Sequence, residues 1–434
     1  MANKSIFCNV PWTNIHVYWD GSYGMCCSER HKPYDEIEKN RYNLSSMPIH
    51  EWYNSDPVRR FRQQISSDTP IPACASCYNE ESLGYESRRI RENFKSVIFT
   101  EQAFERSYLQ SPWIDKFEAG DDLINHTPID WHIDFGNECN LACKMCNEDA
   151  SSSIAATLKR HGISDKQAKV SWTKNSKAWA NFLDAVDAMP IRRIHVMGGE
   201  PVMMRKYHEF IDYLIMKQRF EISLSFVSNG TMINQELIDK LRLFRNVDVE
   251  ISIETIDSSN DYIRQGSTIA KMLSNLSSII SQQDCKLQIV MRTVPQLLSI
   301  SRYVDVIRYA WENKLIIESI PLTRPAYLRI DVLPWEFRQQ YVADLERLRD
   351  EIAKEITFNS VLNGRSKSTL PMKLVGQCDA TIAMLKASTN EDAGKLRTEL
   401  VKHCQFWDGE YDLSIDDYLP ELASMFKEWG YAST

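Results

Sequence analysis

A regular alternation of strand-like and helix-like stretches between residues 127 and 325 most constrains how this chain can fold. Short apolar runs that predict strands are separated by longer stretches whose apolar residues recur at helical spacing. The strands are expected at 131–135, 193–197, 222–227, 247–253, 287–292 and 315–319, and the main helices at 177–188, 207–217, 235–244, 269–281 and 300–312. Such alternation predicts a parallel sheet with crossover helices, here an α/β partial barrel of the TIM type with six strands. In such folds ligands collect at the carboxyl ends of the strands.

Each of the first four predicted strands is followed by residues suited to binding a ligand. These are Cys139, Cys143 and Cys146 after the first strand, Gly198, Gly199, Glu200 and Pro201 after the second, Ser228 and Asn229 after the third, and Ser252, Glu254 and Arg264 at or after the end of the fourth. Two adjacent glycines let a ligand approach the backbone, hydroxyl and amide groups suit sugar hydroxyls, and an arginine suits a carboxylate. Each motif alone is usually only a loop, so the prediction depends on their joint occurrence at successive strand ends.

The three cysteines after the first strand have the spacing CxxxCxxC. Three thiolates so close in sequence can bind three irons of a cubane cluster and leave its fourth iron without a protein ligand. The alternatives are a structural zinc site that lacks its fourth ligand, or a chance grouping of buried thiols.

A second set of cysteines occupies the N-terminal segment. Cys8 precedes a predicted hairpin with an Asp-Gly turn, Cys26 follows it, and Cys74 and Cys77 form a CxxC pair farther along the chain. Four thiolates around one centre would make a closed site. By spacing alone these cysteines fit a zinc ribbon as well as an iron-sulfur cluster.

The motifs of the barrel resemble those of the radical S-adenosylmethionine superfamily over residues 127–322. The resemblance rests on Cys139-x3-Cys143-x2-Cys146 and on the sequence GGEP at 198–201. It implies that the cysteines hold a [4Fe-4S] cluster whose open iron takes the amino and carboxylate groups of S-adenosylmethionine, and that the GGEP loop contacts the amino group. The contacts implied for ribose and carboxylate fall on Ser228, Asn229, Ser252, Glu254 and Arg264.

The same resemblance implies a reaction. S-adenosylmethionine is cleaved reductively to a 5′-deoxyadenosyl radical, which abstracts hydrogen from a substrate. The reducing electron is expected from a donor such as flavodoxin or ferredoxin. The sequence assigns no further catalytic residue.

The N-terminal segment is similar to the opening of the SPASM cysteine pattern and to its shorter relative, the twitch domain. The matching residues here are Cys8, Gly21, Cys26, Cys74 and Cys77. The similarity implies one auxiliary [4Fe-4S] cluster on the four cysteines, with Cys27 as an alternative to Cys26. The segment departs from the family pattern because it precedes the barrel and because no CxxxC follows Cys77. SPASM and twitch relatives imply a peptide or protein substrate, with a small molecule such as a sugar or nucleotide as the alternative.

The chain is expected to divide into four parts: an auxiliary iron-sulfur domain at 1–100, a linker helix at 101–126, the barrel at 127–325 and a helical region at 326–434. Helices in the last part are expected at 334–356, 379–386 and 395–403. That region is expected to pack against the barrel rather than to cap a substrate. The basic residues Arg88, Arg89 and Arg91 are interpreted as a solvated helix face.

The bulk composition narrows the remaining possibilities. Fifty-one basic against fifty-nine acidic residues give a net charge of -8, which argues against a general nucleic-acid binder. No apolar run is long enough for a membrane span and no secretory signal is visible, so the eleven cysteines predict a reducing, cytoplasmic location. Cys285, Cys378 and Cys404 have no partner spacing and are expected to be buried thiols. A scaffold with two zinc sites and no catalytic activity is the competing class of function.

Overall fold

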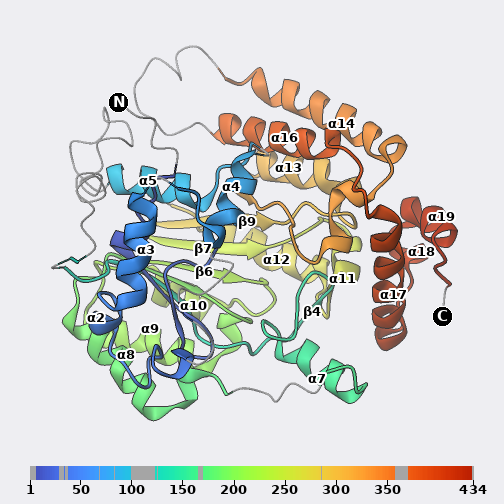
Figure 1. The fold of residues 1–434 in the computed structure, drawn as a ribbon. Coiled ribbons are helices and arrows are strands. Elements are labelled where there is room, and N and C mark those ends of the chain that lie inside the picture. The colour runs from blue at the N-terminus through green and yellow to red at the C-terminus, as the bar shows by residue number, and fades with distance from the viewer. Residues whose placement is uncertain are drawn as a thin grey trace.

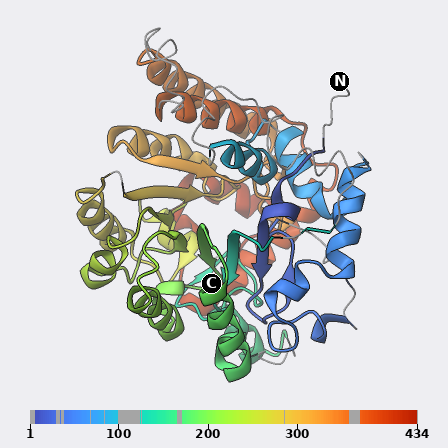
Figure 2. The same cartoon turned by 90° about the vertical axis from the view of Figure 1, so that its left-hand side faces the viewer.

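The computed structural model describes residues 6–28, 34, 38–67, 69–82, 84–98, 123–124, 126–164, 170–284, 286–356 and 370–432. Cys285 and nearly all of the predicted linker helix at 101–126 lie outside these ranges. The described elements surround one central sheet, with helices outside it (Figures 1 and 2).

The central sheet contains all six strands that the sequence predicts for the barrel. They are β3 (Asp130–Asp134), β5 (Arg193–Met197), β6 (Ser223–Ser228), β7 (Val247–Ser252), β9 (Leu287–Thr293) and β10 (Ile316–Ser319). They lie side by side in chain order and every neighbouring pair is parallel. The connecting helices are α8 (Ser176–Ala188), α9 (Arg205–Met216), α10 (Gln235–Leu241), α12 (Ile269–Ile280) and α13 (Tyr303–Glu312). The α/β partial barrel expected from the sequence is therefore confirmed.

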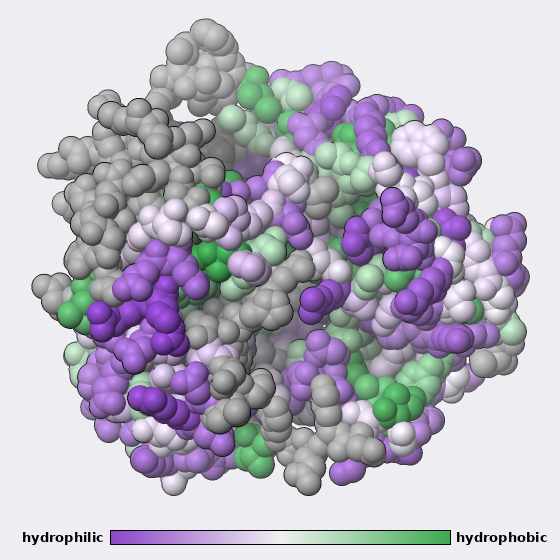
Figure 3. All heavy atoms as spheres, viewed as in Figure 1, coloured by the Kyte–Doolittle hydropathy of each residue, from purple (hydrophilic) through white to green (hydrophobic). Residues whose placement is uncertain are grey.

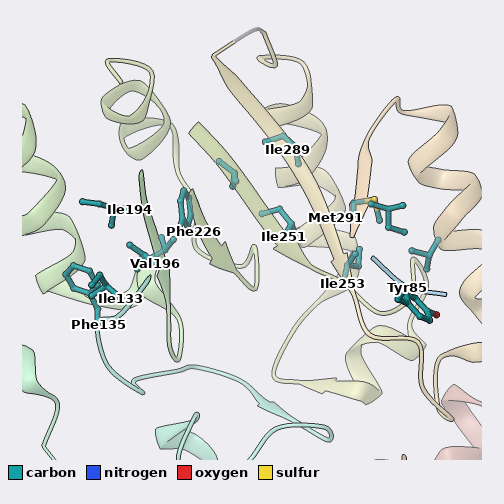
Figure 4. Close-up of a cluster of buried hydrophobic side chains, with 14 of the residues drawn as sticks. Tyr85, Ile133, Phe135, Ile194, Val196, Phe226, Ile251, Ile253, Ile289 and Met291 are labelled. Carbon is teal, nitrogen blue, oxygen red and sulfur yellow. The ribbon is translucent and has the colours of Figure 1, made fainter. Parts of the chain in front are cut away.

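Apolar side chains fill the space between the sheet and its outer helices. Ile133 of the first barrel strand and Phe135, directly after it, lie beside Ile194, Val196 and Phe226 of the next two strands (Figure 4). The ring of Phe135 is 5.4 Å from that of Phe210 on α9. Because strand residues alternate between faces, the residues between these apolar ones point to the other side of the sheet.

The inner face of the sheet is unusually polar. His132, His195 and Ser225 stand opposite one another on β3, β5 and β6. The two histidine rings are 4.1 Å apart, and His195 Nδ1 lies 2.7 Å from Ser225 Oγ. Glu250 Oε1 is 3.5 Å from His195 Nδ1 and continues this row on β7. Burying so many polar groups is costly unless they are paired. Most of these groups are paired, but His132 Nε2 is buried without a hydrogen-bond partner among the described residues.

The N-terminal segment extends the same sheet. β1 (Asn14–Val17) pairs in parallel with β3, and β2 (Tyr23–Gly24) closes the predicted hairpin antiparallel to β1. The sheet of the described residues therefore has eight strands, in the order β10-β9-β7-β6-β5-β3-β1-β2. The expected part at 1–100 is thus joined to the barrel through backbone hydrogen bonds.

Helix α5 (Arg88–Ile98) corrects the prediction of a solvated basic face. Arg88 is only 6% exposed, and its Nη1 contacts Cys27 Sγ and lies 2.5 Å from His132 Nδ1. Arg89 pairs with Glu81 and donates to the carbonyl of Phe7. The interpretation failed because a run of basic residues does not reveal that its helix lies against the inner face of a sheet.

The C-terminal helices form two groups (Figure 1). α14 (Trp335–Ala353) and α16 (Leu370–Lys386) pack together near α13, while α17 (Ala393–Tyr411), α18 (Ile415–Tyr418) and α19 (Pro420–Glu428) lie together at another side. Cys378 on α16 and Cys404 on α17 are fully buried, as expected. No helix in the described ranges is long and apolar enough to cross a membrane. On the face in Figure 3, apolar residues gather only in small patches among hydrophilic ones.

Candidate active site

The three cysteines lie in the loop that follows β3, here called the cysteine loop (residues 139–146). Inside it, the short strand β4 (Ala142–Cys143) pairs antiparallel with β8 (Arg264–Gln265), so that Cys143 stands opposite Arg264. A turn closed by the Cys146 amide donating to the Cys143 carbonyl, at 2.9 Å, brings Cys146 back toward Cys143. The amide of Cys139 donates to Ser152 Oγ at 3.2 Å. These hydrogen bonds hold the loop at the end of the first barrel strand.

The three thiols influence one another, which places them in one neighbourhood. Burial raises the pKa of Cys143 to about 12; Arg264 opposes the rise, and the thiols of Cys146 and Cys139 add to it. Burial also raises the pKa of Cys139 and of Cys146. Metal ligation requires thiolates, so a bound metal would have to displace these protons. The structure brings this predicted ligand set together.

The donor chemistry of the cysteine loop fits an iron-sulfur cluster. Within the described ranges, no three His, Cys, Asp or Glu side chains converge as the ligands of a single metal ion would. Each cysteine of a cubane cluster binds a different iron, so its sulfurs stand farther apart than the ligands of one ion. Three soft thiolates with no fourth cysteine in the loop match a cluster with one open iron.

The glycine pair after β5 lies directly against the chain that leads into the cysteine loop. Gly198 and Gly199 have φ values of +89° and +53°, a region that disfavours side chains. A Cβ on Gly199 would overlap the carbonyl oxygen of Glu138, and one on Gly198 would overlap that of Gly136. The Glu200 amide donates to the Glu138 carbonyl at 2.7 Å. The sequence predicted room for a ligand here; the structure uses the same freedom to bring two backbone segments together.

Glu200 connects the second and third strand ends. Its buried carboxylate accepts from Ser228 Oγ at 2.8 Å, from the Asn229 amide at 2.6 Å and from the Val202 amide at 3.1 Å. Burial raises its pKa, and the bonds from Asn229 and Ser228 oppose the rise. Pro201 begins the short 3-10 helix that follows. Glu200 therefore joins the loop after β5 to the end of β6 through buried hydrogen bonds.

The third strand end is tied to the cysteine loop. Asn229 Nδ2 donates to Asn140 Oδ1 at 2.9 Å, while Asn229 Oδ1 accepts from the Thr231 amide at 3.0 Å. Ser228 Oγ accepts from the Gly230 amide at 3.0 Å and donates to Glu200. Both predicted sugar-binding side chains are thus already hydrogen-bonded within the protein.

The fourth strand end brings a buried ion pair to the cysteines. Arg264 Nη2 lies 2.7 Å from Glu254 Oε1, and Arg264 Nη1 lies 3.7 Å from Cys143 Sγ. Glu254 Oε2 also accepts from the Val294 amide at 2.8 Å. Arg264 Nε is buried and has no hydrogen-bond partner among the described residues. Ser252 ends β7, partly buried.

The four N-terminal cysteines of the expected auxiliary site also lie near one another. Burial raises the pKa of Cys8, and the thiols of Cys74 and Cys77 add to the rise. The pKa of Cys26 is raised first by its hydrogen bond with Cys27 and next by burial, with a contribution from Cys77. Cys27 instead contacts Arg88, and its pKa is lowered first by its bond with Cys26 and then by Arg88 and His132. Cys26 is influenced by Cys77, whereas Cys27 contacts Arg88, and the choice of Cys26 as the fourth ligand stays a prediction.

Two family models match the chain. Residues 133–292 match the radical SAM superfamily, and residues 8–78 match the SPASM iron-sulfur cluster-binding domain. The chain carries a radical SAM domain and a SPASM domain. Both matches enclose the predicted cysteine ligands. Domains of these two kinds bind [4Fe-4S] clusters, and radical SAM domains bind S-adenosylmethionine.

Several curated relatives share part of this chain. The mycofactocin maturase MftC of Mycolicibacterium smegmatis is 27% identical over 183 residues, which cover 41% of this chain and 40% of that protein. MftC of Mycobacterium ulcerans is 25% identical over 41% of this chain and 42% of its own length. The sporulation killing factor maturation protein SkfB of Bacillus subtilis is 22% identical, covering 41% and 37%. The chain spans about two fifths of the length of these relatives.

Solved structures resemble this chain at lower sequence identity than the curated relatives do. Streptococcus suis SuiB bound to S-adenosylmethionine is 14% identical, with a TM-score of 0.37 over 70% of this chain and 64% of that one. The anSMEcpe structure with bound AdoMet is 16% identical, with a TM-score of 0.37 over 52% and 60%.

Sequence reasoning missed one neighbour of the radical SAM site. Lys144 lies between the second and third cysteines, and its Nζ is 2.8 Å from Asp408 Oδ1 on α17. The C-terminal region was expected only to pack against the barrel. No local pattern joins residues 264 positions apart, so only a three-dimensional structure could find this pair.

A cavity of about 580 Å³ lies beside the chain entering the cysteine loop. Trp179 and Met204 line it, with Lys174, Arg205 and Lys206 among its polar residues. Lys174 Nζ lies 2.5 Å from Glu138 Oε1, one residue before Cys139. Arg205 and Lys206 each lie 2.7 Å from Glu209, so three cations stand against two carboxylates at this cavity.

Proposed function

We propose that this protein is a radical SAM enzyme that modifies a peptide or protein substrate. The supporting observation is that the three cysteines of the cysteine loop share one neighbourhood, with the Gly198-Gly199 turn packed against the chain entering that loop and Arg264 opposite Cys143. The peptide substrate is supported by the SPASM match and by relatives that are named maturases. Their partial coverage leaves the reaction outcome to experiment.

In this proposal the cysteine loop binds a [4Fe-4S] cluster that, with S-adenosylmethionine, supplies a 5′-deoxyadenosyl radical for removing hydrogen from the substrate. The residues of the chain itself would bind and orient S-adenosylmethionine. Backbone carbonyls of the GGEP loop would accept from the amino group of S-adenosylmethionine. The unpartnered Nε–H of Arg264 is a donor for its carboxylate, while Glu254 fixes the guanidinium.

Some residues expected to contact S-adenosylmethionine have a structural role in this proposal. Glu200, Ser228 and Asn229 hydrogen-bond one another and the cysteine loop, so we propose that they set the shape of the site. Sugar hydroxyls would then meet backbone groups at the third strand end, or Ser252 at the fourth. Cys8, Cys26, Cys74 and Cys77 would hold one auxiliary cluster with no open iron, suited to accepting an electron or to structure.

The reducing electron would come from an acidic protein such as flavodoxin or ferredoxin. The cations Lys174, Arg205 and Lys206 beside the cysteine loop are the proposed docking surface, because an acidic partner is attracted to a basic one.

Iron content and product formation test the proposal. Anaerobically reconstituted protein should hold about eight irons per chain, and the triple variant Cys139→Ala, Cys143→Ala, Cys146→Ala about four. The triple variant should form no 5′-deoxyadenosine with dithionite and S-adenosylmethionine. Cys378→Ala, which removes a buried thiol far along the chain in α16, is the control and should keep both properties. Colourless protein with stoichiometric zinc would support the scaffold instead.

The substrate class needs a separate measurement. Peptides encoded by short reading frames next to the gene should be co-expressed with the enzyme and examined by mass spectrometry. A mass change, or deuterium incorporated from deuterated water, would support the peptide proposal. Turnover of a sugar or nucleotide with unchanged peptides would contradict it.

A further inference from the structure

The cysteine loop is held by a fully buried ion pair from the C-terminal region. The side chains of Lys144 and Asp408 are both 0% exposed, and Lys144 Nζ lies 2.8 Å from Asp408 Oδ1. The ammonium also lies 4.1 Å from the ring centre of Tyr262 on α11 (Ser259–Ile263), a favourable position for a cation. Figure 1 places α11 and α17 at the same side of the molecule.

The other carboxylate oxygen of Asp408 is also satisfied. It accepts from Tyr262 OH at 3.0 Å and from Tyr431 OH at 2.7 Å. Asp408 therefore gathers groups from the cysteine loop, from α11 and from the chain after α19. Replacing a buried ion pair with apolar residues of similar volume is often neutral or stabilising, so packing alone does not account for this pair.

Hydrogen bonds from side chains to backbone carbonyls join α17 to the cysteine loop and to its paired strand beside the ion pair. His403 Nε2 lies 2.9 Å from the Lys144 carbonyl oxygen and donates to it, while Tyr327 OH lies 3.0 Å from His403 Nδ1. Gln265 Nε2, on the strand paired with Cys143, donates to the Trp407 carbonyl at 3.4 Å. Helix α17 thus contacts β8 and the residue that directly follows β4, the two sides of the small ladder that carries Cys143.

Apolar contacts extend this attachment to the far side of the loop. Trp407 packs in one apolar group with Ala142 of β4 and Ile154 of α7 (Ser152–Arg160), and Cys146 borders that group. Glu410, one turn beyond, pairs with Arg160 and lies 2.7 Å from His161 Nε2. The loop is therefore enclosed between α7 and α17.

We propose that α17 positions the cysteine loop and sets its electrostatic environment, with Asp408 as a positioning residue that acts through Lys144. This inference rests on the proposed cluster at Cys139, Cys143 and Cys146. The buried ammonium favours the more negative, reduced state of a cluster on this loop, and Asp408 offsets that charge. Removing the carboxylate charge should raise the reduction potential, and removing the ammonium charge should lower it.

Potentiometric titration of anaerobic holoenzyme tests this inference, with the electron paramagnetic resonance signal that responds to S-adenosylmethionine as the readout. Asp408→Asn should shift its midpoint upward and Lys144→Met downward, while the signal of the auxiliary cluster keeps its midpoint in both. Asp416→Asn is the matched control, because it removes a partly exposed carboxylate of the same region, paired with Lys427 at 2.7 Å, and should shift neither. Shifts of the same sign, or no shift, would overturn the inference.

Loss of iron in the single variants is the other informative result. If either single variant loses about four irons, the apolar double variant Lys144→Met, Asp408→Leu should regain them, since no unpaired charge is then buried. A double variant that stays depleted would contradict the positioning role. If wild-type protein itself binds no cluster at the cysteine loop, the proposed function fails instead, so the two failures are distinguishable.

Discussion

At the scale of single residues, the site depends on positions where only one residue type fits. Gly199 has a positive φ and lies against the Glu138 carbonyl, immediately before Cys139. The sequence analysis predicted that the glycine pair lets a ligand approach the backbone. Its first neighbour is the protein's own backbone, which no sequence spacing could reveal.

Gly199→Ala should therefore displace the chain that enters the cysteine loop. We expect a loss of about 1–3 kcal/mol in the free energy of unfolding and reduced iron binding, because strain and overlap act together. Thermal unfolding and iron content measure both effects. Gly376→Ala on α16 is the control, since a Cβ there meets nothing within 4 Å and should stabilise the helix slightly. Equal behaviour of the two variants would contradict the account.

Buried thiols make the metal-free protein sensitive to alkali. Burial raises the pKa of Cys143 and of Cys378 to about 12. Thiols in the unfolded chain have a pKa of about 8.5. Above that pH the unfolded chain has released protons that the folded chain keeps, so stability falls as pH rises. The urea midpoint of reduced apo-protein should drop between pH 8 and pH 10, and less steeply in Cys378→Ala. A midpoint that rises with pH would contradict this burial.

At the scale of secondary-structure elements, the barrel was predictable and the attachment of its neighbours was not. Strong periodicity fixed the six barrel strands and the helices between them to within a few residues. β1 was foreseen as part of a hairpin, but its parallel pairing with β3 joins segments more than a hundred residues apart. Arg193 shows the same link, since its guanidinium bridges Asp130 of β3 and Glu92 of α5.

The N-terminal segment should consequently be required for the barrel to fold. A fragment of residues 101–434 leaves β3 as an unpaired edge and removes Glu92 from Arg193, so we expect it to aggregate. Size-exclusion chromatography and circular dichroism of the fragment provide the measurement. Co-expression with residues 1–100 should restore a soluble complex. A monomeric, folded fragment would indicate an independent barrel.

At the scale of the whole molecule, the sequence predicted both cysteine sets and their chemistry but not how the distant parts of the chain meet. The cysteine loop, the GGEP turn and Arg264 come together because parallel strands end at one edge of the sheet. The pair Lys144–Asp408 arises from tertiary packing of a helix near the C-terminus. Motif spacing therefore predicts the ligands of a site better than the groups that position them.

The central claim is that the cysteine loop carries a cluster with an open iron that S-adenosylmethionine reaches. The most direct measurement is the electron paramagnetic resonance spectrum of dithionite-reduced protein with and without S-adenosylmethionine. We predict that the cofactor changes the spectrum of wild-type protein and of the variant Cys74→Ala, Cys77→Ala. A spectrum that S-adenosylmethionine leaves unchanged, in protein carrying its full iron, would contradict the claim.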